Sequence, residues 1–269
     1  MQKSETTGME AALMKAGASR QELRRMVAAL RTRLQLDMAL NRAVPASSLR
    51  KQGVPKRVSE AAPDGGRVER ASFPERFPIE TAGQTPDPPE QILENVREAL
   101  GDCRRCPLCK TRTNLVFGEG HPHAKLVFVG EAPGADEDRQ GLPFVGKAGQ
   151  LLTRIIVAMG LERRDVYICN ILKCRPPENR NPRPEEIAAC EPFLIRQLQA
   201  IGPKMICALG TFSAHTLLKT EIPISQLRGR FHRYQGMDLM PTYHPAYLLR
   251  NPAAKRQVWE DVQKIMKAL

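Results

Sequence analysis

The sequence predicts an α/β domain built on a central, mostly parallel four-stranded sheet flanked by helices. Short apolar runs that suit buried strands recur at residues 125–130, 166–171, 205–210 and 239–243. Helical patterns alternate with these runs, and strands that alternate with helices form βαβ units whose strands are parallel. Apolar residues make up 42% of the chain, which is enough to fill a core around such a sheet.

Four helical patterns accompany the predicted strands. Residues 148–159 carry one apolar stripe, and Gly160 is a natural residue just past the end of that helix. Pro184 suits the first turn of a second helix. A third helix is predicted at about residues 254–269, and a shorter one at 92–100 leads into a group of cysteines.

Two further segments are predicted before the α/β domain, which we expect at residues 91–269. Residues 1–44 are predicted to form a helical extension, because Ser19 and Glu22 make a capping box ahead of an apolar stripe. Residues 45–90 are rich in proline among Gly, Ser, Glu and Arg, a composition that cannot bury a core and is typical of a disordered linker. The N-terminal helix could dock on the α/β domain, contact another protein or pack on nothing stable, and we expect the chain itself to be a monomer.

The composition and the net charge indicate which cellular compartment and which kind of partner to expect. The net charge of +12 favours a polyanionic partner such as nucleic acid, since phosphates reward clustered Lys and Arg by counterion release. Neither a membrane-spanning apolar run nor an apolar N-terminal leader occurs, so we expect a cytoplasmic protein without membrane contact. Seven cysteines in a reducing compartment favour metal binding or burial over a disulfide framework.

Five of the cysteines have a spacing that suits a metal centre. Cys103, Cys106 and Cys109 form a C-x-x-C-x-x-C run, and such short loops can aim their sulfurs at one ion or cluster. The fourth cysteine that usually precedes a proline in such runs is absent locally, so a further ligand must come from far away in the chain. Cys174 and Cys190 are the candidates for it.

The identity of the metal is left open by the spacing alone. Zinc is the alternative to an iron–sulfur cluster, with His121 or His123 as conceivable ligands. Sulfur-only ligation and the lack of well-spaced histidines favour iron and sulfur. Cys169 and Cys207 lie inside apolar strands, and we expect them to be buried small hydrophobes.

The predicted strands are followed by residues that suit a ligand site, because ligands of open α/β sheets bind beyond the carboxyl ends of the strands. An acidic Gly/Pro loop at 130–138 follows the first strand, and Phe144 comes shortly after it. Asn170 ends the second strand, and His244 follows the fourth. Each residue alone could be structural, as part of a turn, a core or a cap, but their convergence on one rim favours a site.

This set of residues favours hydrolysis of a bond to a planar heterocycle. Neither a P-loop nor a G-x-S-x-G elbow occurs, which leaves P-loop nucleotide hydrolysis and serine-hydrolase chemistry unsupported. Phe144 can stack on a base, Asn170 can pair with its hydrogen-bonding edge, and His244 can stabilise negative charge on the departing ring. A carboxylate nearby can orient the attacking water.

Four long motifs follow one another in an order that is characteristic of one protein family. They are GEAPGADED (130–138), GLPFVGKAGQLL (141–152), CNILKCRPPENRNP (169–182) and HPAYLLRNP (244–252). Together with the cysteines, they resemble the family 4 uracil-DNA glycosylases, which carry a [4Fe–4S] cluster, over about residues 100–268. The resemblance implies an enzyme that releases uracil from single- or double-stranded DNA, leaving an abasic site for base excision repair.

The resemblance also implies the ligands of the cluster. The family's ligand positions match Cys103, Cys106, Cys174 and Cys190. Cys109 departs from the family's pattern as an extra cysteine that could compete for the cluster. We expect the cluster to be structural and to hold the segment between its two distant ligands near DNA.

The uracil pocket implied by the resemblance is formed by five residues. Glu131 and Ala132 lie at its first motif, and Phe144 is the stacking platform. Asn170 reads the edge of the base, and His244 stabilises the leaving uracil. Flipping a base costs roughly a few kcal/mol, and less from a mismatch, so uracil opposite guanine should open more easily than uracil opposite adenine.

The residue that activates water is left open by the sequence. Ala132 stands where better-known uracil glycosylases carry an aspartate, so that role must move to another side chain. Glu131 and Glu137 are the two candidates, and the sequence does not choose between them.

Contacts to DNA are predicted outside the pocket. Tyr247, Leu248 and Leu249 lie at the tip of the last motif and could act as a wedge for the gap left by a flipped base. Arg228 and Arg230 flank a glycine whose backbone could approach a phosphate. Asn179 is a family-like polar position on the loop after the second strand.

Two other classes of protein are weighed against this prediction. A non-catalytic, metal-stapled DNA-binding module associated with replication would explain the charge and the cysteines, but it would leave the four strand-end residues as coincidence. An electron-transfer ferredoxin fits poorly, because the chain is basic and its pocket is larger than a carrier needs.

Overall fold

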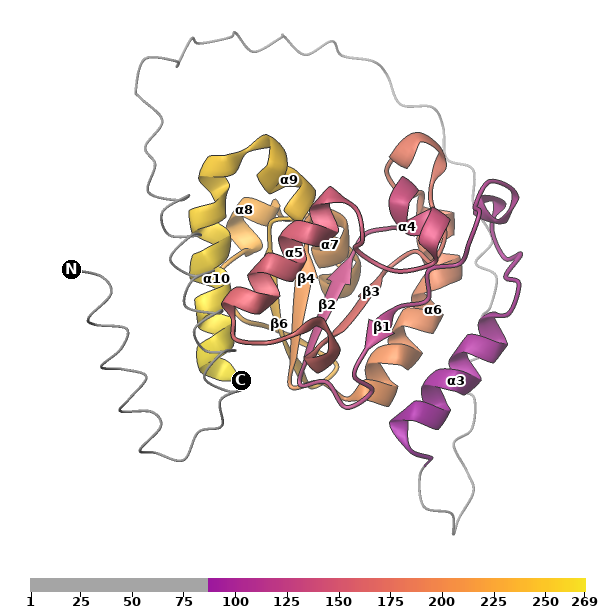
Figure 1. Cartoon of the computed structure of the whole chain (residues 1–269), viewed down its shortest axis with the longest axis horizontal. Helices are drawn as coiled ribbons and strands as arrows, with labels where there is room; N and C mark the ends of the chain where they lie inside the picture. The colour runs from indigo at the N-terminus through magenta and orange to yellow at the C-terminus, as the bar shows by residue number, and fades with distance from the viewer. Residues whose placement is uncertain (1–86) are drawn as a thin grey trace, which may run out of the picture. The chain divides into compact units, whose positions relative to one another are not determined.

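The computed structural model describes residues 87–269, and Figure 1 shows how their helices and strands are arranged. The predicted N-terminal helix and nearly all of the predicted linker lie outside the described residues. Among the helices that are described, none is long and apolar enough to cross a membrane.

A six-stranded sheet forms the centre of the domain, in the order β1-β3-β2-β4-β6-β5. The four inner strands run parallel to one another, and the two edge strands run antiparallel to their neighbours. The strands are β1 (Glu119–Gly120), β2 (Leu126–Gly130), β3 (Tyr167–Asn170), β4 (Met205–Leu209), β5 (His232–Tyr234) and β6 (Met237–Thr242).

The α/β class is confirmed, but the predicted number of four strands was wrong. The predicted strands are the four inner ones, in which β2, β3 and β4 are buried along their whole length and therefore give continuous apolar runs. The two edge strands were missed because β1 has two residues and β5 has three. Strands this short show no apolar run or alternation. The sheet is thus mixed, with its parallel part confined to the inner strands.

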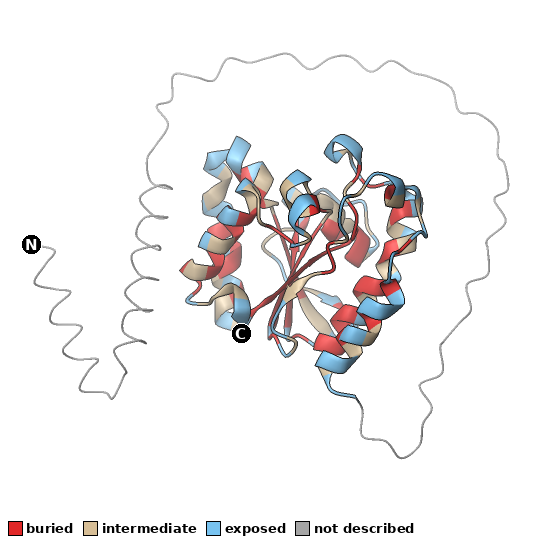
Figure 2. Cartoon of the chain, turned by 45° about the vertical axis from the view of Figure 1, so that its right-hand side comes forward, coloured by how far each residue is buried: buried red, intermediate tan, exposed pale blue. Residues whose placement is uncertain are grey.

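Helices cover both faces of the sheet (Figures 1 and 2). One face packs against the first group of helices, and the other packs against the second. The first group is α3 (Pro89–Leu100), α6 (Pro184–Ile201), α7 (Thr211–Leu218) and α8 (Ile224–Leu227). The second group is α5 (Lys147–Ala158) and α10 (Lys255–Ala268). The four predicted helices are confirmed as α3, α5, α6 and α10.

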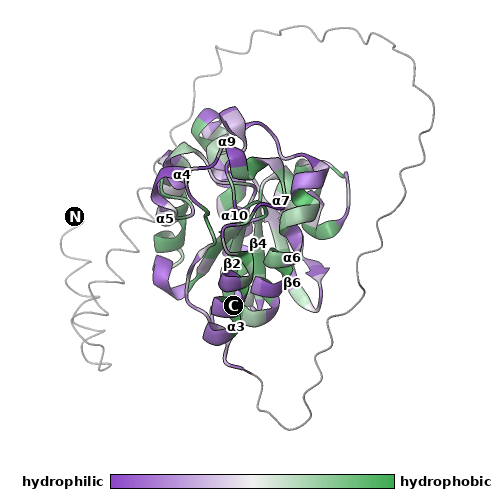
Figure 3. Ribbon diagram, turned by 90° about the vertical axis from the view of Figure 1, so that its right-hand side faces the viewer, coloured by the Kyte–Doolittle hydropathy of each residue, from purple (hydrophilic) through white to green (hydrophobic). Residues whose placement is uncertain are grey.

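The sheet separates two hydrophobic cores because strand side chains alternate between its faces. Val127 and Val129 of β2 belong to the core beside α3 and α6, whereas Leu126 and Phe128 belong to the core beside α5 and α10. Hydrophobic residues accordingly concentrate in the sheet and on the inward sides of the helices (Figure 3). Both cysteines predicted to be buried in strands are fully buried.

Short helices lie at the carboxyl ends of the inner strands. The segment predicted as an acidic loop contains the start of α4 (Ala135–Gln140), and α9 (Pro245–Arg250) begins directly after His244. Two single turns, η2 (Pro107–Lys110) and η4 (Pro177–Asn179), follow two of the cysteine positions. This end of the sheet is therefore where the candidate functional residues meet.

Candidate active site

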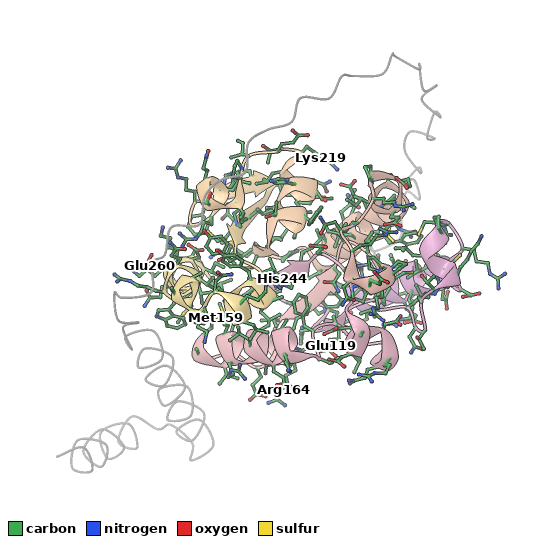
Figure 4. The ribbon with its side chains drawn as sticks, turned by 90° about the horizontal axis from the view of Figure 1, so that it is seen from above. Glu119, Met159, Arg164, Lys219, His244 and Glu260 are labelled. Atoms are coloured by element: carbon green, nitrogen blue, oxygen red, sulfur yellow. The ribbon has the colours of Figure 1, made fainter. Side chains whose placement is uncertain are left out.

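A pocket of about 400 Å³ opens at the carboxyl ends of the inner strands. In the view from above, His244 lies over the middle of the domain (Figure 4). The lining includes every residue predicted for the catalytic and uracil-binding roles, and two of the predicted DNA contacts: Glu131, Ala132, Glu137, Phe144, Asn170, Asn179, His244 and Tyr247. The fold thus gathers into one cavity the four motifs that lie far apart in the sequence.

Two glycines let the pocket side chains pack closely on the strand ends. A Cβ at Gly130 would overlap Oδ1 of Asn170 and lie 2.6 Å from the ring of Phe144. A Cβ at Gly210, whose φ is +90°, would lie 2.9 Å from Cβ of His244. Because contacts this short are not tolerated, alanine at either glycine would displace the side chains that form the pocket.

Asn170 carries an unpartnered acceptor at the end of β3. The residue is 1% exposed, and its Oδ1 has no hydrogen-bond partner. Within residues 87–269, Oη of Tyr234 is the only other buried side-chain polar atom in this state. An unsatisfied buried acceptor costs about 1–3 kcal/mol. The fold therefore leaves a carbonyl oxygen without a donor on a residue that lines the pocket.

His244 is the N-cap residue of α9, and its Nδ1 accepts a hydrogen bond of 3.1 Å from the N–H of Ala246. A neutral ring that accepts at Nδ1 carries its proton on Nε2. Burial, with a smaller contribution from Arg250, lowers the pKa of His244 from 6.5 to about 4. The imidazole is therefore neutral at pH 7 and can donate a hydrogen bond from Nε2.

Phe144 is buried beside this histidine. The centroids of the two rings lie 5.5 Å apart, with an angle of 34° between the ring planes. The backbone of Phe144 has a φ of +53°, a conformation that residues other than glycine rarely adopt. Backbone strain of this kind persists where the surrounding structure fixes it, and it is typical of functional positions.

Glu137, one of the two candidates for activating water, is committed to backbone hydrogen bonds. Its Oε1 accepts from the N–H groups of Val145 and Gly146, both at 2.9 Å, and its Oε2 accepts from Gly134 at 3.1 Å. Val145 and Gly146 directly follow Phe144. The carboxylate of Glu137 therefore holds the phenylalanine loop, and few of its lone pairs are left for water.

Glu131, the other candidate, follows β2 and is half-buried in the pocket. Within the described residues its carboxylate makes no hydrogen bond or ion pair. Burial raises the pKa of Glu131 from 4.5 to about 7. A carboxylate without partners and with a pKa near neutrality suits a general base.

Asn179 lies on an exposed loop at the rim of the pocket. Nε of Arg175 donates to its Oδ1 at 2.8 Å, so the amide NH₂ group is left for another partner. Arg180 and Arg250 also line the pocket, and neither was singled out from the sequence. Both lie within the long sequence motifs described above, and membership of these motifs is the only feature of the sequence that indicates them.

The residues predicted to act as a wedge lie on α9 and differ in their exposure to solvent. Tyr247 is 38% exposed, and its ring lies 4.9 Å from that of Tyr243. Leu248 is 1% exposed and packs in the core against α5 and α10. The helix turns the side chain of Leu248 inward in this structure, so the contact of Leu248 with DNA stays a prediction. Leu249 is the exposed leucine of the pair.

Of the two arginines predicted to contact phosphates, one is paired within the domain and the other is exposed. Arg228 is bound to the buried Asp261 through Nε at 2.9 Å and Nη2 at 2.6 Å, and its side chain is 15% exposed. Its guanidinium is thus occupied within the domain. A Cβ at Gly229 would lie 2.8 Å from Oδ1 of Asp261, so the glycine serves this close packing. Arg230 is exposed and has a free approach to a ligand.

Four cysteines from three separate segments lie within electrostatic reach of one another. Cys106 interacts with Cys103, Cys174 with Cys106 and Cys190, and Cys190 with Cys103 and Cys106. None of them forms a disulfide, and three are buried. Cys109 lies in η2, of which Cys106 is the N-cap, and it also interacts with Cys106. No three His, Cys, Asp or Glu side chains of the described residues converge as on a single metal ion.

The chemistry around these cysteines fits a negatively charged centre. Nη1 of Arg105 donates to Sγ of Cys103 at 3.3 Å, and Nη1 of Arg112 donates to Sγ of Cys174 at 3.4 Å. Burial raises the pKa of Cys174 to about 12, and the nearby guanidinium of Arg112 opposes this shift. Four cysteines flanked by cations are the donor set that an iron–sulfur cluster requires.

Comparisons with known proteins agree with this geometry. Residues 117–263 match the family model described as "Uracil DNA glycosylase superfamily". The chain is 46% identical to the type-4 uracil-DNA glycosylase of Thermotoga maritima over 179 residues, which cover 65% of this chain and 93% of the relative. It is 46% identical to that of Archaeoglobus fulgidus over 184 residues, or 65% of this chain and 92% of the relative.

A more distant relative is the type-5 uracil-DNA glycosylase of Pyrobaculum aerophilum, which is 32% identical over 182 residues, covering 55% of this chain and 80% of the relative. The two type-4 relatives match at higher identity and over nearly their whole length. The chain therefore belongs to the type-4 uracil-DNA glycosylases of the uracil-DNA glycosylase superfamily.

Proposed function

We propose that this chain removes uracil from DNA by hydrolysing the N-glycosidic bond, which leaves free uracil and an abasic site for base excision repair. The observation that carries the proposal is the unpartnered Oδ1 of Asn170, buried beside Phe144 in the pocket. The N3–H group of uracil is the donor that this oxygen lacks. The names of the type-4 relatives support the same activity.

Asn170 also provides the basis for discrimination against cytosine. Its Oδ1 would accept from N3–H of uracil and its NH₂ group would donate to O4. Cytosine presents an acceptor at N3 and a donor at C4, so it would leave both groups of Asn170 unpaired. Sites that hydrogen-bond their substrate in this way reject an analogue with the wrong pattern by about 10⁴-fold or more.

His244 stabilises the leaving group in the proposed reaction. The bond between C1′ of the deoxyribose and N1 of uracil breaks, and its electron pair moves onto the uracil ring. The neutral imidazole then donates from Nε2 to the developing negative charge, without first having to lose a proton. Preorganised donors of this kind are each worth about 10²–10³ in rate.

Water completes the hydrolysis by adding to C1′ and giving up a proton. We propose that Glu131 takes this proton, because its carboxylate has no partner within the domain whereas that of Glu137 accepts three backbone hydrogen bonds. The free amide NH₂ of Asn179 is a second group that can hold the water at the rim. Glu137 is then a positioning residue for Phe144.

A [4Fe–4S] cluster held by Cys103, Cys106, Cys174 and Cys190 completes the proposal. Its chemistry in this role would be to cross-link the segment before η2, the loop after β3 and helix α6 through iron–thiolate bonds. The loop after β3 also carries Asn179 of the pocket. Cys109 is proposed as a non-ligand.

DNA is the proposed partner, as single or double strands that contain uracil. Three predicted contacts are exposed: Tyr247, Arg230 and Asn179, of which Asn179 lies at the rim of the pocket. We propose residues 91–269 as the catalytic domain. The expectations of a cytoplasmic monomer, of a linker at 45–90 and of a protein contact through residues 1–44 stay predictions.

The test is excision from an oligonucleotide with one uracil, followed by alkaline cleavage of abasic sites. We expect strand scission with uracil, none with thymine or cytosine, and loss of scission in Asn170→Ala. The alternative of a non-catalytic DNA-binding module predicts equal binding to all three oligonucleotides and no scission with any of them. That result would overturn the proposed function.

A further inference from the structure

Arg163 lies outside the pocket, in the single turn η3 (Arg163–Asp165) that follows α5. Its guanidinium donates from Nη2 to the carbonyl oxygen of Pro143 at 2.8 Å and from Nη1 to that of Phe144 at 3.1 Å. These carbonyls belong to the loop that presents the phenylalanine ring to the pocket. One side chain thus grips two consecutive backbone groups at a position where the backbone is strained.

Further contacts fix the orientation of this guanidinium. Nε of Arg163 donates to Oε1 of Glu119 at 3.0 Å, and the two side chains form an ion pair. Nη1 also donates to Oγ1 of Thr153 at 3.2 Å, on helix α5. Arg163 is therefore held from the edge strand β1 and from α5 while it holds the loop, and its planar fork suits such a multidentate role.

The loop that carries Phe144 is gripped from both of its polar sides. Glu137 accepts from the N–H groups of Val145 and Gly146, which follow Phe144. Arg163 donates to the carbonyl oxygens of Pro143 and Phe144. The carboxylate of Glu137 and the guanidinium of Arg163 thus make hydrogen bonds to the backbone groups of four consecutive residues. Without them, the positive φ of Phe144 has little to maintain it.

Close packing of the loop on α5 adds a steric constraint. A Cβ at Gly149 would overlap the backbone carbonyl of Phe144, so the loop lies directly on the first turn of the helix. The contact is made by the same carbonyl group to which Arg163 donates, so the packing and the hydrogen bond act on one peptide group.

We propose that Arg163 is a positioning residue for uracil excision, which acts by holding the backbone of Phe144 in the conformation that presents its ring as a stacking platform. The inference rests on the proposed function. It assigns a role in base recognition to a side chain that lines a separate surface hollow with Glu119 and Arg164, outside the uracil pocket. Glu119 and Arg164 are labelled in Figure 4 on the same side of the domain.

A double-mutant cycle tests this role in the full-length protein with its metal centre intact. Single-turnover excision from a duplex with uracil opposite guanine is measured for wild type, Arg163→Ala, Phe144→Ala and the double variant. We expect Arg163→Ala to slow excision by about 10- to 100-fold, since small misplacements of a binding group cost this much. In the Phe144→Ala background the same change should alter the rate by no more than about twofold.

Two further variants keep the outcome interpretable. Arg164→Ala is the matched control, because Arg164 is exposed and pairs only locally with Glu162 at 2.9 Å, and it should excise within about twofold of wild type. Arg163→Lys keeps the charge but loses the fork, and we expect an intermediate rate. If Arg163→Ala does not fold, the cycle is run with Arg163→Lys on the same criteria.

Two results would overturn the inference while wild type remains active. One is excision by Arg163→Ala at the wild-type rate. The other is an equal loss of rate with and without the Phe144 ring, which would mean that Arg163 acts independently of the platform. Absence of excision by the wild-type protein is a separate result, which refutes the proposed function.

Discussion

The choice between Glu131 and Glu137 as the residue that activates water can be decided with two isosteric variants. Glu137→Gln keeps the side-chain shape but replaces one acceptor oxygen by an NH₂ group. In the structure the Oε2 atom faces the N–H of Gly134 at 3.1 Å, so the variant sets a donor against a donor. The two remaining bonds to backbone N–H groups also lose their charge.

The expected cost for Glu137→Gln is mainly one of stability. Hydrogen bonds to charged groups are each worth about 1.5–3 kcal/mol, so the loss of one and the weakening of two should lower the free energy of unfolding by about 2–3 kcal/mol. For a domain of this size that corresponds to a fall in Tm of about 5–10 °C. Excision should slow by only about tenfold, through displacement of the Phe144 loop.

Glu131→Gln should behave in the opposite way. Loss of a general base slows the chemical step by about 10²- to 10⁴-fold. The single-turnover rate of wild type should rise with pH and level off above about 7, where the carboxyl of Glu131 becomes ionised, and the variant should lack this inflection. Burial raises this pKa, so the folded state retains a proton that the unfolded state has lost between pH 4.5 and about 7. The contribution of Glu131 to stability therefore falls as pH rises through that window, and Glu131→Gln should be at least as stable as wild type above pH 7.

The assay combines single-turnover excision from pH 5 to 9 with thermal unfolding of each variant. Asp136→Asn, on the same short helix as Glu137, is the matched control and should resemble wild type in both measurements. A large loss of rate in Glu137→Gln with unchanged Tm, together with near-normal excision by Glu131→Gln, would refute the assignment of the two carboxylates.

Further predictions concern His244, the cysteines and helix α9. Because the pKa of His244 falls from 6.5 to about 4 on folding, the unfolded state binds a proton between these pH values that the folded state does not bind. Acidification from pH 6.5 to 4 should therefore lower the free energy of unfolding by at most about 3 kcal/mol. Urea titrations of His244→Ala should lack this part of the loss. The same variant should slow excision by about 10²- to 10³-fold while its Kd for uracil-DNA changes little, and a parallel loss of binding would contradict the leaving-group role. Serine at Cys174 should abolish the iron content and the visible absorbance of the purified protein, whereas serine at Cys109 should leave both intact; equal loss in the two would make Cys109 a ligand. Alanine at Tyr247 should slow excision from duplex DNA more than from single strands without changing Tm. Leu248→Ala should instead lower the free energy of unfolding by about 2–5 kcal/mol, because this side chain is buried. The reverse pattern would mean that Leu248 is the DNA contact.

The inner part of the fold could be predicted from the sequence because burial on both faces leaves a strong signal. β2 and β4 are five residues long and wholly buried, so each gives a continuous apolar run. The edge strands lack this signal. β5 consists of His232, Arg233 and Tyr234, a run that no pattern of hydrophobicity separates from a loop. β5 is a strand because it pairs with β6, and the sequence of such a short segment does not indicate its pairing partner.

The identity of the pocket residues was predictable, whereas their division of labour was not. Asn170 and His244 could be located because they directly follow strands and lie in long motifs. The commitment of Glu137 to three backbone N–H groups depends on a turn geometry that the sequence does not specify. The inward direction of Leu248 likewise depends on where α9 begins, and that position is set by His244 as its N-cap.

The specificity of the pocket follows from which polar groups the fold leaves free. Glu137 is used by backbone amides, Nδ1 of His244 by the N–H of Ala246, and Oδ1 of Asn179 by Arg175. The groups that remain include both ends of the Asn170 amide, Nε2 of His244, the NH₂ group of Asn179 and the carboxylate of Glu131. The amide of Asn170 is the complement of an N3–H group and a C4 carbonyl, the donor of His244 is the complement of a developing anion, and the carboxylate of Glu131 is the complement of a water molecule. Cytosine presents the opposite pattern at N3 and C4, so it would leave both groups of the buried Asn170 side chain unpaired.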